Sequence, residues 1–450
     1  MPPQKPDESP THDPGDPDVD PTTRVVVWMT LLAAVAGVIT GFVGGAFRWL
    51  LVRADRLRLD IVAWAHDAGP AGWLVPIAVS AVAAGIAGLI GARIPLSAGS
   101  GIQHVEAVDR KEADPPTGEV IPARFVGGLL SIGIGGLVLG REGPTVHMGA
   151  AIGALCGRLV RATADEIRVL QSVMSGAGLA VAFNAPIGGA LFCLEEVAHT
   201  IRLRYVLWTM SAVALAVMCS RVILGDHPDF QVFDVAEPAF STLPVFVVFG
   251  GLLALLGVAY GWLIRACLTA FAAVSHIPKP LRSAAIGAVI GAVLMVDADL
   301  VGGGDTLTQA ILAGQHLTFI ALVVIMVVRF AAGPLSYAAN TSGGLFAPML
   351  ALGALCGVLF ARVLDLLWAG LGTDLLPALM LVGMATLFTS VVRAPLTGAV
   401  LVMEMTATTS VAVAILAAGA AAMIVAQLLD APPIYDSLRQ RMLGAEPDER

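Results

Sequence analysis

Residues 136–146 read GLVLGREGPTV, and this stretch decides how the surrounding chain is predicted to fold. An adjacent pair of opposite charges, Arg141 and Glu142, interrupts an apolar run between two glycines. Pro144 stands where a helix would have its first turn, a position that proline favours. A helix that starts here directs its unpaired N–H groups and the positive end of its dipole toward Glu142. The stretch therefore predicts a helix N-terminus inside apolar surroundings, with a carboxylate beside it.

The composition places those apolar surroundings in a membrane. Of the 450 residues, 57% are apolar and 13% are charged, and the mean hydropathy is +0.83. A soluble domain carries about 25% charged residues, so this chain has too little charge to cover a globule in water. The composition argues against a water-soluble enzyme and predicts a polytopic membrane protein in contact with the lipid bilayer.

The distribution of charge and cysteine argues against several other classes of partner. The formal net charge is −8, and residues 1–23 hold six acidic residues against one lysine. The remainder has no basic footprint, so no nucleic-acid partner is predicted. The five cysteines stand singly in apolar runs without a CxxC motif, so we expect small buried side chains, with no metal and no cofactor.

The chain divides into a polar tail and a long apolar body. Residues 1–23 contain seven prolines and almost nothing apolar, so they are predicted to be a disordered cytoplasmic tail. From Val25 onward apolar stretches follow one another, many of them interrupted by glycine, proline or a single charge. Such interruptions indicate broken or re-entrant helices, which a membrane tolerates only where the backbone lines a polar cavity.

Three motifs recur in the same order at a nearly constant offset of 203 to 209 residues. The matches are APIGGA at 185–190 with APLTGA at 394–399, Pro144 with Pro348, and GSG at 99–101 with GGG at 302–304. We interpret them as a duplication, with halves at 24–225 and 240–435 and a short cytoplasmic tail at 436–450. Duplication combined with broken helices is typical of transporters, whose binding site lies near the bilayer midplane between the halves.

Three glycine-containing turns could together form an anion site. They are GSGI at 99–102, GREGP at 140–144 and GLFAP at 344–348. Each lies against an apolar segment that could begin a helix, and partial charges at a helix N-terminus bind an anion weakly enough to let it leave. Each turn alone could be an ordinary glycine-rich helix contact. Taken together, and with Glu142 in one of them, they favour anion binding.

These three motifs, in this order, resemble the signature motifs of the CLC family of chloride channels and proton/chloride antiporters. Tyr435 stands where that family keeps a chloride-coordinating tyrosine, and the resemblance covers about residues 25–440. It implies an all-α membrane fold of two inverted-topology repeats of tilted and broken helices, and a homodimer with an anion path in each subunit. The anion-binding positions that it implies are Ser100, Gly101, Ile102, Gly143, Leu345, Phe346 and Tyr435.

One position departs from the family pattern. The family usually has proline after the Gly-Ser-Gly-Ile run, whereas this chain has Gln103. Glutamine restores a backbone N–H and loosens the turn, since proline fixes the backbone and lacks that donor. The substitution is either tolerated or alters the anion preference of the site.

Two acidic residues are the candidate proton carriers. An ionisable residue inside a membrane costs at least ~2.5–3.5 kcal/mol, which makes it a functional candidate by default. Glu142 could occupy the anion site when ionised and leave it when protonated, and the resemblance assigns the gating glutamate to this position. A salt bridge to the neighbouring Arg141 is the structural alternative. By resemblance Glu196 matches the inner proton-transfer glutamate, and it favours an antiporter over a channel.

Three other polar residues are expected to be structural. Glu195, whose repeat partner is Glu404, is one of them. Glu106 is predicted to form a buried ion pair with Arg124. His147 follows the GREGP motif closely, and we expect a packed or hydrogen-bonded helix residue rather than a proton relay.

The sequence therefore predicts a secondary active transporter that exchanges chloride for protons. We expect it in the inner or plasma membrane, multi-pass, with both termini in the cytoplasm. The alternatives are a passive anion channel of the same fold, or an exchanger whose anion preference Gln103 changes. An enzyme is not predicted, because no metalloprotease motif such as HExxH is present.

Overall fold

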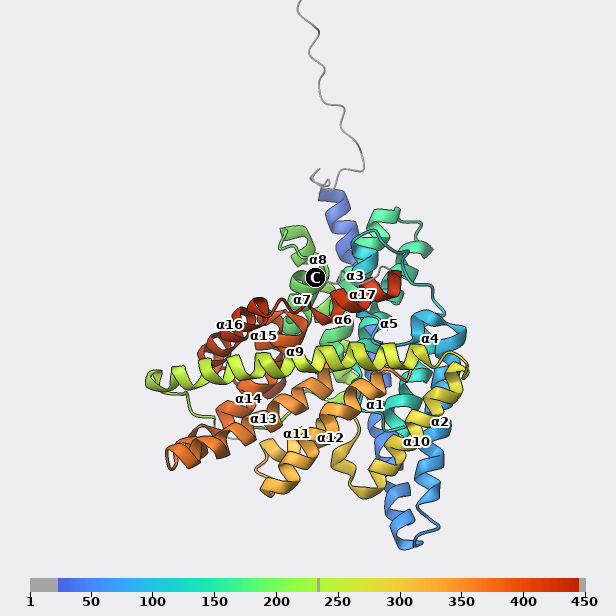
Figure 1. Ribbon diagram of the computed structural model, residues 1–450. Coiled ribbons are helices and arrows are strands. Elements are labelled where there is room, and N and C mark those ends of the chain that lie inside the picture. Colours follow the sequence, from blue (N-terminus) through green and yellow to red (C-terminus); the bar gives the residue numbers. More distant parts are fainter. Residues whose placement is uncertain (1–22, 233–234, 445–450) are drawn as a thin grey trace, which may run out of the picture.

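The computed structural model describes residues 23–232 and 235–444, and within them the backbone forms helices and no β-strand (Figure 1). The helices before the central loop are α1 (Thr23–Asp67), α2 (Leu74–Arg93), α3 (Ile102–Asp109), α4 (Val120–Gly128), α5 (Glu142–Leu159), α6 (Ala164–Phe183), α7 (Pro186–Phe192) and α8 (Leu203–Leu224). Those after it are α9 (Leu243–Ala273), α10 (Lys279–Val296), α11 (Asp305–Leu312), α12 (Phe319–Tyr337), α13 (Phe346–Leu367), α14 (Leu371–Val392), α15 (Pro395–Thr406), α16 (Ala412–Leu428) and α17 (Ile434–Leu443).

The all-α membrane architecture is confirmed. Eight helices of the described chain are long and apolar enough to cross a bilayer, namely α1, α2, α8, α10, α12, α13, α14 and the segment Phe240–Ala273 that includes α9. A span needs about 20 apolar residues. Large apolar side chains such as Leu31, Val222 and Ile320 are exposed on these helices. They give the molecule an apolar outer surface that suits lipid rather than water.

Several helices of the described chain are too short to cross a membrane. Helices α3, α7 and α11 have eight, seven and eight residues, and α15 has twelve. Gly101 before α3 and Gly304 before α11 have φ values of 86° and 99°, a left-handed conformation that glycine adopts without strain. The predicted breaks therefore occur at the glycine-rich motifs.

The same local arrangement occurs at two places in the chain. Next to Gly101 lie the side chains of Arg124 and His147, and next to Gly304 lie those of Arg329 and Ala351. Each arginine is fully buried and donates hydrogen bonds to carbonyl groups of the loop that leads into its short helix. The two arginines are 205 residues apart, close to the motif offset. This correspondence supports the interpretation of the chain as two related halves.

The ends of the chain differ in part from the predicted tails. Residues 1–22 and 445–450, to which most of the two tails was assigned, lie outside the described residues, and Thr23 already begins α1. Residues 436–443 belong to α17 rather than to a tail. The reason is packing, since Ile434, Tyr435 and Leu438 are buried on one face of that helix, which contacts α3.

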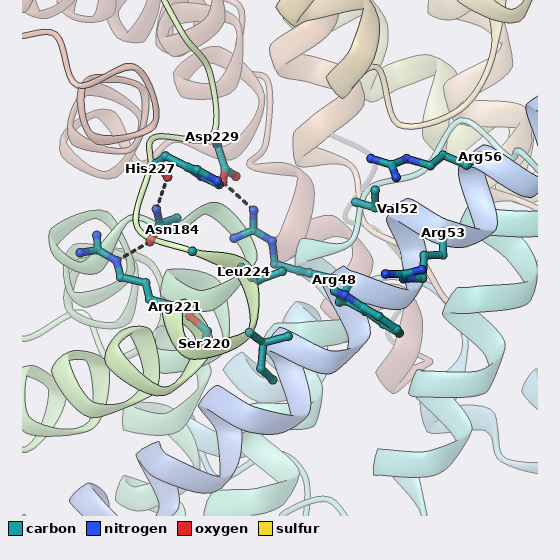
Figure 2. Close-up of a pocket in the computed structure, with 13 residues that line it drawn as sticks. Arg48, Val52, Arg53, Arg56, Asn184, Ser220, Arg221, Leu224, His227 and Asp229 are labelled. Atoms are coloured by element: carbon teal, nitrogen blue, oxygen red, sulfur yellow. Dashed lines mark hydrogen bonds and ion pairs between the residues drawn. The ribbon is translucent and has the colours of Figure 1, made fainter.

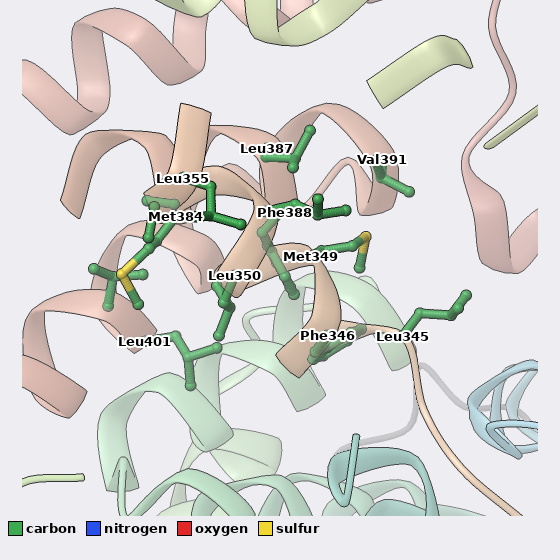
Figure 3. Close-up of a cluster of buried hydrophobic side chains, with 14 of the residues drawn as sticks. Leu345, Phe346, Met349, Leu350, Leu355, Met384, Leu387, Phe388, Val391 and Leu401 are labelled. Atoms are coloured by element: carbon green, nitrogen blue, oxygen red, sulfur yellow. The ribbon is translucent and has the colours of Figure 1, made fainter. Parts of the chain in front are cut away.

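The interior around α13 and α14 is a continuous apolar cluster. Phe346, Met349 and Leu350 of α13 pack beside Phe388 of α14 and Leu401 of α15 (Figure 3). The rings of Phe346 and Phe388 meet edge to face with centroids 4.6 Å apart. This packing fixes the N-terminus of α13 in the centre of the molecule.

Two carboxylates hold α7 and α15 against each other. Glu195 follows α7 and accepts hydrogen bonds from the N–H groups of Leu396 and Thr397 at the start of α15, at 3.0 and 2.6 Å. Glu404 at the end of α15 accepts from the N–H groups of Ile187 and Gly188 at the start of α7, at 3.0 and 2.7 Å. Each helix thus caps the free N–H groups of the other, and the structural interpretation of Glu195 and its partner Glu404 is confirmed.

Removing either cap should destabilise the protein. We expect Glu195→Ala and Glu404→Ala each to cost about 1–2 kcal/mol, because two amides lose a charged acceptor. Glutamine at either position should cost less, since it keeps one acceptor oxygen. Thermal unfolding in detergent measures the effect, with Glu119→Ala as the control for an exposed acid. A transition temperature that matches that of the control would contradict the capping role.

Candidate functional site

The three glycine-rich turns lie side by side. Gly99 donates to the carbonyl of Thr341 at 2.8 Å and accepts from the N–H of Gly343 at 3.2 Å. Gly140 and Gly344 exchange two hydrogen bonds of 2.9 and 2.8 Å. Segments more than 200 residues apart in sequence are thereby joined at the start of α3, α5 and α13, so the structure brings together the motifs that the sequence analysis selected.

Glu142 occupies the N-terminus of α13. Its side chain is fully buried, and one carboxylate oxygen accepts a hydrogen bond of 2.6 Å from the backbone N–H of Phe346. A Cβ atom on either Gly140 or Gly344 would collide with this carboxylate. Only glycine at these two positions leaves room for the carboxylate. The other carboxylate oxygen has no hydrogen-bond partner among the described residues.

Two hydroxyl groups accompany that oxygen. The side chains of Ser100 and Tyr435 are fully buried and their hydroxyls lie near each other, but neither forms a hydrogen bond of ordinary geometry in the described part of the chain. The ring of Tyr435 packs against that of Phe346 with centroids 5.8 Å apart. Burying an unpaired polar group costs about 1–3 kcal/mol. A cluster of such groups at helix N-termini fits a small anion that accepts hydrogen bonds from them.

Not every predicted amide is free to bind an anion. The N–H of Phe346 donates to Glu142, and the N–H of Gly101 donates to the side-chain oxygen of Gln103 at 3.1 Å. The N–H of Ser100 donates to the hydroxyl of Tyr337 at 3.2 Å. Gln103 thus covers a donor that a proline at this position would leave uncovered. The remaining predicted positions, Ile102, Gly143 and Leu345, are buried at the same three helix starts.

Arg141 does not pair with Glu142. Its guanidinium contacts Asp229 at 2.8 Å and Asp305 at 3.6 Å, and it donates to the carbonyl of Ala182 at 2.8 Å. The alternative interpretation of Glu142 as half of a local salt bridge is therefore wrong. Asp229 comes from the loop after α8, and nothing in its sequence context indicated that it would reach the motif.

A chain of buried side chains links α3, α4 and α5. Arg124 donates to Nδ1 of His147 at 3.0 Å, and Nε2 of His147 contacts Nδ1 of His104 at 3.0 Å. The hydrogen-bonded interpretation of His147 is confirmed. The predicted ion pair between Glu106 and Arg124 is wrong, because loop carbonyls and His147 take the donors of that guanidinium.

Glu196 lies near the opposite end of α3 from Ser100. It is buried on a π-helical turn at Cys193–Val197, and the charges of Asp436 and Glu195 act on it. Its charge in turn acts on Glu106, which is buried with one oxygen unpartnered. The sequence analysis did not select Glu106 as a functional residue, and only the packing of α3 against this turn reveals the pair. No group of three potential metal ligands occurs among residues 23–232 and 235–444.

The histidine link should be structural. We expect His147→Ala to lower stability by about 1–3 kcal/mol, because it leaves a nitrogen of Arg124 and a nitrogen of His104 buried without a partner. His147→Gln should lose less, since its amide can both accept and donate. Thermal unfolding of the two variants in detergent measures this order. An alanine variant as stable as the unsubstituted protein would contradict it.

Comparisons with known proteins agree on the family. The model of the family described as "Voltage gated chloride channel" matches residues 82–427. A protein of Vibrio parahaemolyticus named "H(+)/Cl(-) exchange transporter ClcA" is 33% identical over 424 residues, which cover 92% of this chain and 89% of that protein. The relative of the same name from Citrobacter koseri is 30% identical over 429 residues and covers 93% and 90% of the two chains.

Solved structures agree on the fold. The crystal structure of a slow cyanobacterial Cl-/H+ antiporter is similar with a TM-score of 0.86 and 28% identity, and it covers 93% of this chain and 98% of that one. A CLC-type fluoride/proton antiporter is similar in fold alone, with a TM-score of 0.75 at 18% identity, over 92% and 98% of the two chains. Since the family match spans most of the chain and the three motifs meet at one site, this protein belongs to the CLC family of voltage-gated chloride channels.

Proposed function

We propose that this protein is a secondary active transporter that exchanges chloride for protons across a membrane. The observation that carries the proposal is the hydrogen bond between the Glu142 carboxylate and the N–H of Phe346, beside the unpartnered hydroxyls of Ser100 and Tyr435. The relatives that are about one third identical are named as H(+)/Cl(-) exchange transporters, and they support the same activity.

The chemistry follows from competition for one helix N-terminus. The ionised carboxylate of Glu142 binds the Phe346 amide as an anion would, and it excludes another anion by occupancy and charge. Protonation removes that charge, so the side chain leaves and chloride takes its place. Ser100, Gly101, Ile102, Gly143, Leu345, Phe346 and Tyr435 are the positions we propose to surround the chloride. Each proton bound thereby admits a chloride, which couples the two fluxes.

A second carboxylate must carry the proton to the other side of the membrane. Chloride that occupies the site blocks Glu142 as a path, so the proton needs a carrier away from the anion. We assign this role to Glu196, which is buried on the far side of α3, and Glu106 beside it gives the proton a neighbouring acceptor.

The assembly and the orientation belong to the same proposal. Two halves at 24–225 and 240–435, inverted with respect to each other, would place α5 and α13 in opposite orientation around the anion. We propose a homodimer with one pathway in each subunit, embedded in the inner or plasma membrane. The start of α1 and the end of α17 both lie in the upper half of Figure 1, which fits two cytoplasmic termini.

The alternative function is a passive anion channel with this fold. The presence of an ionisable residue at Glu196 favours the exchanger, because a channel has no need of a second proton carrier. Gln103 favours an exchanger with an altered anion preference. Its side chain covers the Gly101 amide, which could change the preference of the site among anions.

Replacing Glu142 should uncouple the two fluxes. Glu142→Gln keeps the shape of the side chain and removes its charge, so chloride should continue to cross liposome membranes while proton pumping disappears. Chloride and pH electrodes outside chloride-loaded liposomes measure both fluxes. Glu119→Gln changes an exposed carboxylate outside the three motifs, so this control should retain uphill proton movement. Intact coupling in Glu142→Gln would remove this residue from the mechanism.

Replacing Glu196 separates the exchanger from the channel. We expect Glu196→Gln to abolish proton movement to the level of protein-free liposomes while chloride movement remains measurable. Glu195→Gln is the matched control, since it alters the neighbouring carboxylate, and it should keep the coupling. If the unsubstituted protein moves chloride without uphill proton flux at any pH, the protein is a passive channel and the exchange function is refuted.

A further inference from the structure

A basic cavity lies where α8 ends against α1. Its volume is about 340 Å³, and the ionisable residues that line it are Arg48, Arg53, Arg56, Arg221, His227 and Asp229. Figure 2 shows these side chains around the end of α8, with Arg53 and Arg56 on the continuation of α1. The cavity lies outside the proposed anion site, because it contains none of the residues of the three glycine-rich motifs.

The packing of the two helices places this cavity at the edge of the membrane. Gly37 and Gly41 of α1 approach Ala212 and Ala216 of α8, so the two helices advance in the same direction. Helix α8 is long and apolar enough to cross a membrane and ends at Leu224, whereas α1 continues past that level. The arginines of α1 therefore lie at the end of a spanning helix, where basic side chains reach the lipid headgroups.

The rim of the cavity carries exposed apolar side chains. The side chains of Trp49 and Val52 line it and are 41% and 45% exposed. Tryptophan concentrates at the boundary between lipid and water, where its ring is apolar and its N–H is wet. An occupant of this cavity can therefore contact arginines on one side and hydrocarbon on the other.

The positive charge of the cavity is only partly compensated. Arg48 pairs with Asp229 at 2.5 Å, and Arg221 pairs with Asp226 at 2.7 Å. Arg53 stacks over the ring of Trp49 at 3.8 Å. No carboxylate among residues 23–232 and 235–444 forms an ion pair with Arg53 or Arg56. These two guanidinium groups are the donors that remain for an anionic ligand.

We propose that this cavity binds a phosphate group. The planar guanidinium presents paired N–H donors that match two phosphate oxygens, and several arginines around one cavity fit a tetrahedral oxyanion better than a single small ion. The phosphate can belong to the headgroup of an anionic phospholipid or to free inorganic phosphate. The apolar rim gives a lipid an additional contact that inorganic phosphate lacks.

A bound phosphate would be connected to Glu142 through two ion pairs and the adjacent Arg141. Asp229 pairs with Arg48 in the cavity and with Arg141, the residue before Glu142. A phosphate that draws Arg48 away leaves Asp229 more strongly engaged with Arg141. This consequence rests on the proposed exchange function, whereas binding of the phosphate does not.

The experiment compares two double variants of the full-length protein. Arg53→Gln/Arg56→Gln removes the two donors from the cavity, and Arg24→Gln/Arg265→Gln removes the same charge elsewhere. In one arm, the proteins are released from nanodiscs of phosphatidylcholine with a minority of phosphatidylglycerol, and the retained lipid is identified by native mass spectrometry. In the other arm, inorganic phosphate is titrated while thermal unfolding is followed in detergent, with chloride at equal ionic strength as the reference.

The outcomes are distinct. If the ligand is a lipid headgroup, retention of phosphatidylglycerol should fall about ten-fold in the cavity variant alone, because that variant loses two charge-assisted contacts. Stabilisation by inorganic phosphate that is lost in the cavity variant alone supports free phosphate. If neither ligand binds, or if both double variants lose it equally, the proposal is overturned. Both binding measurements stand whether or not the protein exchanges chloride for protons.

Discussion

A backbone that breaks inside a membrane must have its free N–H and C=O groups satisfied by the protein itself, because lipid offers no hydrogen bonds. The rest of this structure depends on that constraint. Arg124 and Arg329 donate to the carbonyls of the loops before α3 and α11. Glu195 and Glu404 accept from the amides at the start of α15 and α7. These two buried arginines and two partly exposed carboxylates are what allow short helices to begin within the fold.

The same constraint creates the site. Where three helices begin together, their free amides and dipoles provide positive partial charge without a mobile cation. Glu142 places its carboxylate on one of these amides, in a seat kept open by Gly140 and Gly344. A carboxylate held by partial charges can exchange with another anion, whereas a buried arginine would hold either of them firmly. The backbone amides that need hydrogen-bond partners at the helix breaks are thus the same groups that attract an anion.

The rigid frame around the site comes from packing. The cluster of Phe346, Phe388 and Leu401 fixes the start of α13, and the chain from Arg124 through His147 to His104 fixes the start of α3 relative to α5. Beside Gly304, Ala351 stands in the place that His147 takes beside Gly101. The histidine link therefore occurs at Gly101 and not at Gly304, so the two arginine-bound loops differ in their packing.

The sequence by itself determined the fold class and the three motifs that meet at the candidate site. Low charge and interrupted apolar runs predicted broken membrane helices, and glycine with proline at the motifs marked where the helices begin, because these signals are local. Tertiary structure alone decided the partners of the charged side chains. Arg124 joined His147 instead of Glu106, and Arg141 joined Asp229, which comes from a distant loop. Residues 436–443 became a helix because α3 offers it a surface. The partners of these charged side chains depend on how elements far apart in the chain pack together. A local pattern of residues does not predict that packing.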